Sequence, residues 1–273
     1  MSRSKSNIST VKADAEAKLY ADAKVELPPT CELALFIDRT IQTAERWRTN
    51  PSDLSIFPHV FEAMHLYRIA KAVLPLADCP DRSYYLNRLT SGELDFFKRV
   101  ESDAKNVFWE LEFASSLRAR CPGLELRDPS DIVIPLLQGQ LGVACKKIYS
   151  ENNIEKTLSV AVSQVKDFDV GLVALNLDEL LPSDAVAKAR SQRDLAHMLQ
   201  APLGEFLQRH DRHFRKYLSR ERIIAAVVVI HSIADMPFWE PRFDVVAEAL
   251  IWSFPDLTSE KQSLLDEFRR AVI

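Results

Sequence analysis

The stretch GVACKKIYSENNIEKTLSVAVSQVK, residues 142–166, decides how the middle of the chain is interpreted. Its first part is a short apolar run that ends at the paired lysines Lys146 and Lys147, which is typical of a buried strand. Over residues 154–166 the apolar positions recur at helical spacing, so we expect a helix that carries Gln164. A lysine on a buried strand needs a partner for its charge.

Two more short apolar runs precede this strand. LELR (124–127) and DIVIPLL (131–137) are read as strands, and the Gln138-Gly139 pair is typical of a two-residue hairpin turn before QLGVACKKI (140–148). The order helix, three strands, helix and strand predicts a mixed α/β fold with a central sheet.

The predicted turn places an acid opposite the lysine. If residue 137 pairs with residue 140, Asp131 lies directly across from Lys146 and on the same sheet face as Ala144. One interpretation is a cross-strand ion pair worth a few tenths of a kcal/mol at a sheet end.

The rest of the chain suggests three parts. We expect a flexible polar lead over 1–28, a helical N-terminal subdomain over 29–91 and an α/β domain over 92–273. The last part should contain a helix over 92–120 and strands at 169–177 and 223–233. We also expect a helical insertion at about 184–222, interrupted near Pro202, and helix over the last thirty or so residues.

Composition limits the function classes. Lys and Arg number 35 against 39 Asp and Glu, so a net charge of −4 argues against a surface that binds polyanions everywhere. The four cysteines are scattered without metal-finger spacing, and no phosphate-binding glycine loop occurs. No apolar stretch has the length of a membrane span or signal region, so we expect a cytoplasmic protein without a membrane partner.

Four residues follow one another in a suggestive order: Glu110 on a helix, Asp131 opening a strand, Lys146 near the end of the next strand and Gln164 on the following helix. This set resembles the PD-(D/E)XK nuclease superfamily, which includes restriction endonucleases and Holliday junction resolvases. The resemblance covers about residues 100–177 and implies a restriction-endonuclease-like core. It implies a metal-dependent nuclease that hydrolyses nucleic acid, DNA favoured, in defence or repair.

The resemblance also assigns roles. In such enzymes carboxylates hold Mg²⁺, which activates a water and stabilises charge on the phosphate. Asp131 is then the central metal ligand, and Lys146 positions the water or neutralises the phosphate. Glu110 is the helix carboxylate, Glu112 is the fallback metal ligand, and Gln164 orients the substrate. We expect Mg²⁺ as cofactor, with Mn²⁺ as a substitute that binds such ligands more tightly.

Ala144 departs from the family pattern, which has Glu or Asp two residues before the lysine. Alanine has no ligand atom, and Cys145 points to the other face of the strand. Two interpretations stay open. Either Glu110 or Glu112 completes a Mg²⁺ site, or the chain is a catalytically degenerate nuclease-like module that binds nucleic acid or a protein partner.

The segment QRHDRHFRKYLSRER, residues 208–222, is rich in positive charge. A helix with its basic face on the side of Lys146 would track a phosphate backbone. The alternative is a solvated helix face, because Asp211 and Glu221 are interspersed. The residues expected to contact nucleic acid share a positive charge and are Lys147, Arg209, Arg212, Arg215 and Lys216. The resemblance adds a homodimer as an expected partner, and the N-terminal helices are an expected docking surface for another protein.

Overall fold

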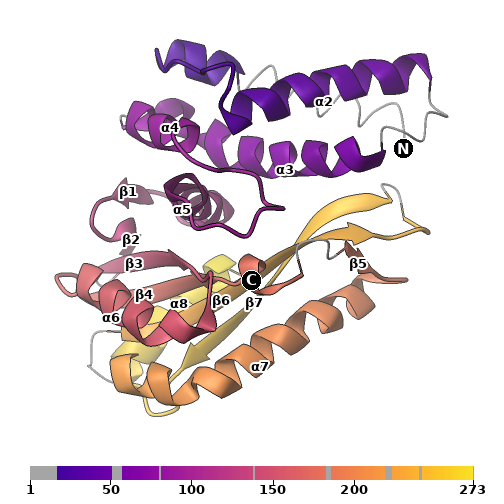
Figure 1. Cartoon of the computed structure of the whole chain (residues 1–273). Coiled ribbons are helices and arrows are strands. Elements are labelled where there is room, and N and C mark those ends of the chain that lie inside the picture. Colours follow the sequence, from indigo (N-terminus) through magenta and orange to yellow (C-terminus); the bar gives the residue numbers. More distant parts are fainter. Residues whose placement is uncertain are drawn as a thin grey trace. The chain divides into compact units, whose positions relative to one another are not determined.

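The computed structural model describes residues 17–50, 57–79, 81–137, 139–182, 186–218, 223–239 and 242–272. These residues form helices and a seven-stranded mixed sheet (Figure 1), so the predicted mixed α/β fold is confirmed. Residues 1–16 of the predicted lead and Gln138 of the predicted turn lie outside the described part. Residues 17–22 are helical; Leu19 and Tyr20 are buried, whereas residues 17, 18, 21 and 22 are exposed.

The sheet has the order β1-β2-β3-β4-β6-β5, and β7 also pairs with β6. Its strands are β1 (Glu125–Arg127), β2 (Asp131–Leu136), β3 (Gly139–Lys147), β4 (Val170–Asn176), β5 (Val186–Lys188), β6 (Ile223–Asp235) and β7 (Phe243–Ser253). The β1-β2-β3 part is antiparallel, whereas β3 with β4, β4 with β6 and β5 with β6 are parallel pairs. The five predicted strands are therefore present, and β5 and β7 are additional.

The helices are α2 (Glu32–Thr49), α3 (Phe57–Val73), α4 (Arg82–Thr90), α5 (Asp103–Arg118), α6 (Ile154–Gln164), α7 (Gln192–Leu218) and α8 (Ser259–Val272). Short 3₁₀ turns are η2 (Leu74–Asp78), η3 (Glu151–Asn153) and η4 (Asp178–Leu180). The helical character predicted for 29–91 is confirmed for its described residues by α2, α3 and α4.

Three predicted helix limits are wrong. The helix expected over 92–120 begins only at Asp103, because the Glu93 and Asp95 side chains accept hydrogen bonds from backbone N–H groups two residues on and hold a turn. The helix α7 runs without interruption through Pro202, because one face is buried along its whole length. Residues 243–253 form β7 and not helix, since they pair with the long strand β6.

The chain divides into two compact units. The first comprises residues 1–112, 183–192 and 232–246, and the second comprises 113–182, 193–231 and 247–273. The predicted boundary at residue 91 does not coincide with this division. The second unit holds β1 to β4, most of β6, and helices α6, α7 and α8; α6 and α7 lie on the same side of its strands (Figure 1).

The core of the second unit is built around β4, whose seven residues are all buried. Gly171 on β4 is required by close packing, because a Cβ there would lie 2.6 Å from the Val165 side chain. This close approach brings the end of α6 against the sheet beside β3.

Candidate functional site

The β2–β3 hairpin carries Asp131 and Lys146. Leu136 pairs with Gly139 and Ile132 with Val143, so the predicted pairing of residue 137 with residue 140 is wrong. One step further along the ladder, Asp131 is level with Ala144 and not with Lys146. The shift is two residues, which keeps every side chain on its face. The expected register is wrong, whereas the predicted contact between Asp131 and Lys146 is present.

Gly139 explains the misplaced turn. This glycine belongs to β3, with φ +132°, and a Cβ on it would lie 2.6 Å from the carboxylate oxygen of Asp169. The same carboxylate accepts a hydrogen bond from the backbone N–H of Gln140 at 2.9 Å. The glycine is therefore required by the close approach of Asp169 and does not mark a turn centre.

Asp131 and Lys146 form the centre of the site. The Nζ of Lys146 lies 3.4 Å from Oδ2 of Asp131, and the side chains are 22% and 10% exposed. The same oxygen accepts a hydrogen bond from the backbone N–H of Cys145 at 2.7 Å. Burial raises the pKa of Asp131, and Lys146 and the Cys145 N–H offset this effect only in part.

Gln164, the last residue of α6, reaches the loop before Asp131. Its Nε2 donates to the backbone carbonyl of Pro129 at 2.6 Å. Three of the four residues in the predicted set, Asp131, Lys146 and Gln164, are thus brought to one place in the second unit.

In the row of the sheet that contains Asp131, Arg127 of β1 pairs with Asp131 on one side, whereas the positions on the other side are apolar. Ala144 is fully buried and pairs with Val173, which pairs with Ala226. Residues directly opposite one another share a face. Within this described row, Asp131 is therefore the one carboxylate.

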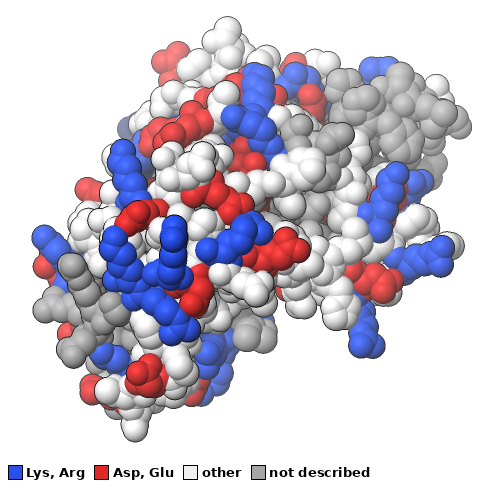
Figure 2. Space-filling view, turned by 60° about the horizontal axis from the view of Figure 1, so that its bottom comes forward, with Lys and Arg blue, Asp and Glu red and all other residues white. Residues whose placement is uncertain are grey.

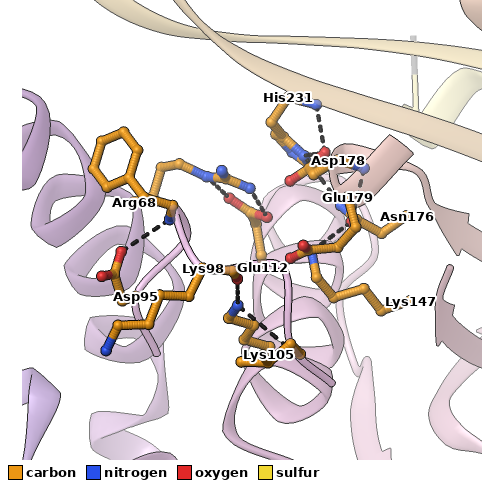
Figure 3. A network of polar contacts seen from close by, with 12 residues as sticks. Arg68, Asp95, Lys98, Lys105, Glu112, Lys147, Asn176, Asp178, Glu179 and His231 are labelled. Carbon is orange, nitrogen blue, oxygen red and sulfur yellow. Dashed lines mark hydrogen bonds and ion pairs between the residues drawn. The ribbon is translucent and has the colours of Figure 1, made fainter. Parts of the chain in front are cut away.

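The two helix glutamates belong to the first unit and have arginine partners there. Glu112 accepts two hydrogen bonds of 2.8 Å from the Arg68 guanidinium (Figure 3), which also lies over the ring of Phe108. Glu110 is buried, with its carboxylate 3.8 Å from the guanidinium of Arg88. Arg68 therefore pairs with Glu112 in these contacts, whereas Arg88 donates two hydrogen bonds to Asp103, at 3.0 and 2.7 Å, and lies at ion-pair distance from Glu110.

The donor set does not fit the Mg²⁺ site that the resemblance implies. Mg²⁺ takes oxygen ligands at octahedral positions, usually from one or two carboxylates. In the second unit Asp131 is the one carboxylate of its row, and its Oδ2 already faces an ammonium and an amide N–H. In the part of the chain that the structure describes, no group of three or more His, Cys, Asp or Glu side chains is suited to hold a metal ion.

Lys147 lies on the opposite sheet face from Lys146 and is buried. Its Nζ donates to Oδ1 of Asn176 at 2.9 Å and lies 3.4 Å from Glu179, and the side chains of Lys147 and Glu179 are each 2% exposed. Lys147 was expected to contact nucleic acid, but the apolar strand carries its ammonium inward to these partners. Figure 3 shows the cluster.

The Lys147 cluster includes residues that sequence reasoning missed. Oδ1 of Asp178 accepts a hydrogen bond from the His231 backbone N–H at 2.7 Å and lies 3.2 Å from Nδ1 of its ring. The backbone N–H of Asp178 donates to Asn176 at 3.2 Å. The available signal was the pattern of polar residues directly after β4, together with a histidine inside the apolar strand β6.

The basic residues of α7 mostly face acids. Arg209 donates to Glu151 at 2.9 Å, Arg215 donates to Asp211 at 2.7 Å, and Lys216 contacts Glu155. Arg212 donates to the His213 ring at 3.2 Å. Figure 2 likewise shows Lys and Arg beside Asp and Glu over the visible face. The positive charge of three of these four residues is therefore largely offset.

Comparison with known proteins found no family model that matches the chain, and no curated protein or solved structure with significant similarity. Within the described residues, no helix is both long and apolar enough to cross a membrane.

Proposed function

We propose that the chain is a nuclease-like module that binds nucleic acid but lacks a complete divalent-metal site. The order α5, β1, β2, β3, α6 and β4 supports the nuclease-like part, because Asp131, Lys146 and Gln164 stand on the elements that the PD-(D/E)XK pattern requires. The observation that carries the proposal is the buried Ala144 level with Asp131, in a described row whose other residues, Arg127, Val173 and Ala226, carry no carboxylate.

Lys146 is the group that favours an anionic ligand at this site. Its side chain is 22% exposed, and its ammonium donates to the Cys145 carbonyl at 3.0 Å and lies 3.4 Å from Asp131. A phosphate oxygen that approached this ammonium would compete with Asp131, so we expect binding to be weak and to fall with salt. The resemblance adds a role in defence or repair, a cytoplasmic location and a homodimer, all as parts of this proposal.

A metal-dependent nuclease is the second candidate. It is favoured by the grouping of Asp131, Lys146 and Gln164, because an ion pair between Asp131 and Lys146 alone would not require Gln164 beside it. This candidate draws its second carboxylate from Glu110 or Glu112, and both are ion-paired with arginines in the first unit.

One set of assays distinguishes the candidates. Labelled single- and double-stranded DNA and RNA are tested for binding by fluorescence anisotropy at two salt concentrations, and for cleavage in Mg²⁺ or Mn²⁺. We expect binding without cleavage, weakened by Lys146→Ala and unchanged by Lys156→Ala, an exposed lysine on α6. Cleavage that Asp131→Ala abolishes would establish the nuclease. Absence of binding to every nucleic acid would refute the proposal and favour a protein partner, for which α2 to α4 are the proposed docking surface.

A further inference from the structure

The loop that delivers Asp131 has an unusual backbone. Asp131 has φ +62°, in the left-handed region that costs an L-residue other than glycine roughly 1 kcal/mol. Such a conformation persists where the surroundings hold it in place. Within the loop, the Ser130 carbonyl accepts from the N–H of Ile132 at 2.7 Å, and Ser130 itself is fully buried.

Gln164 ties this loop to α6. Its Nε2 donates to the Pro129 carbonyl at 2.6 Å, across 35 positions of sequence. Its Oε1 is buried and has no hydrogen-bond partner. A buried carbonyl oxygen without a hydrogen-bond partner is costly. The hydrogen bond from Nε2 to the Pro129 carbonyl is therefore the contact that sets the orientation of the Gln164 amide.

We infer that Gln164 is a positioning residue, whose amide fixes the 129–131 loop and through it the Asp131 carboxylate. The loop held in this way directs Oδ2 of Asp131 to the Cys145 N–H at 2.7 Å and to the Lys146 ammonium. Gln164 acts through Pro129 and Asp131, in contrast to the substrate-orienting role that the family resemblance implies. The positioning of Asp131 by Gln164 does not depend on the proposed function; only the use of the positioned carboxylate in a nucleic-acid site rests on it.

The Cys145 amide reports on this arrangement. Its hydrogen bond to the Asp131 side chain depends on where Asp131 is held. A general loss of stability accelerates hydrogen exchange at all core amides of β3 alike. The ratio of exchange at Cys145 to exchange at Val143, which lies within the β2–β3 ladder, therefore isolates the positioning effect.

The test uses NMR on the full ¹⁵N-labelled chain. Gln164→Ala and the volume-conserving Gln164→Met remove the donor, and Gln262→Ala removes a comparable helix amide that bonds Asp266 at 2.9 Å. We expect both Gln164 variants to raise the Cys145-to-Val143 exchange ratio about tenfold and to shift the Cys145 resonance, with no change in Gln262→Ala. In an Asp131→Gly background, Gln164→Met should leave the ratio unchanged, because the carboxylate is absent.

An unchanged ratio in both Gln164 variants would overturn the inference, as would an equal change in Gln262→Ala. A rise in the Asp131→Gly background as large as that in the wild-type chain would assign Gln164 to general packing. The exchange measurement contains no nucleic acid. It can therefore be interpreted even if the chain is found not to bind nucleic acid.

Discussion

At the scale of single residues, two adjacent lysines on one strand have different roles. Lys146 shares a face with Asp131 and is partly exposed, whereas Lys147 faces Glu179 and Asn176 and is buried. The strand alternation that separates them follows from sequence alone. The partners of Lys147 do not, because Asn176 and Glu179 reach it only through the parallel pairing of β3 with β4.

The buried Asp131 gives a pH-dependent prediction. Burial raises its pKa in the folded state, so its contribution to stability is fully present below the unfolded pKa of about 3.9 and is lost as pH rises through the folded value. Asparagine does not ionise, keeps the acceptor for Cys145 and tolerates positive φ. We therefore expect Asp131→Asn to match the wild type in urea unfolding near pH 3.5 and to be more stable at pH 7.

Asp211 is the matched control for this prediction. Its hydrogen bond with Arg215, and then that with Trp252, lowers its pKa, so its contribution is present above the unfolded pKa and lost as pH falls through the folded one. Asp211→Asn should destabilise at pH 7 and have no effect in acid. If Asp131→Asn behaved in the same way, the ion pair with Lys146 would outweigh the burial of Asp131.

The Lys147 ion pair gives a prediction about stability. Lys147→Met leaves Glu179 buried without this partner, which typically costs about 3–5 kcal/mol in the free energy of unfolding. Lys146→Met on the other face should cost much less, because its side chain is partly exposed. Urea denaturation compares the two variants. The double variant Lys147→Met/Glu179→Gln should recover part of the free energy of unfolding that Lys147→Met loses. A cost for Lys147→Met no larger than that for Lys146→Met would argue against the buried pair.

At the scale of elements, sequence patterns located most strands and failed at their limits. Apolar runs identified β2, β3, β4 and β6, because burial on both faces leaves a continuous signal. The strand β7 was missed, since none of its residues is fully buried and its pattern does not separate strand from helix. The hairpin register was misplaced because Gly139 serves packing against Asp169.

Pro202 gives a prediction for α7. A proline inside a helix removes one backbone hydrogen bond and crowds the preceding turn, which is why an interruption was expected. Pro202→Ala restores the donor, so we expect the free energy of unfolding to rise by up to about 3 kcal/mol, measured with urea. A loss of stability would mean that the packing of α7 requires the proline at this position.

The basic residues of α7 give a prediction about binding. Arg215 is paired with Asp211, whereas Arg212 contacts the His213 ring. If α7 contacts a phosphate backbone, Arg212→Glu should weaken nucleic-acid binding more than Arg215→Glu, most clearly at low salt. Fluorescence anisotropy measures both affinities. Binding unaffected by either change would remove α7 from the proposed interface.

At the scale of the whole molecule, the four residues of the nuclease-like set divide between the two units. Glu110 lies in the first unit, while Asp131, Lys146 and Gln164 lie in the second. Sequence order predicted the grouping of the last three, because it follows from one hairpin and the next helix. The sequence could not indicate that Arg88 and Arg68 lie beside Glu110 and Glu112, since these pairs depend on how α3 and α4 pack against α5.

Divalent-metal binding tests the central claim most directly. Titration calorimetry with Mn²⁺, which binds such ligands more tightly than Mg²⁺, compares the wild type with Asp131→Asn and Ala144→Glu. We predict that Asp131→Asn leaves the Mn²⁺ titration of the wild type unchanged. Ala144→Glu should gain Mn²⁺ binding, because it adds a second carboxylate beside Asp131. Stoichiometric Mn²⁺ binding by the wild type that disappears in Asp131→Asn would contradict the claim and establish a metal site at Asp131.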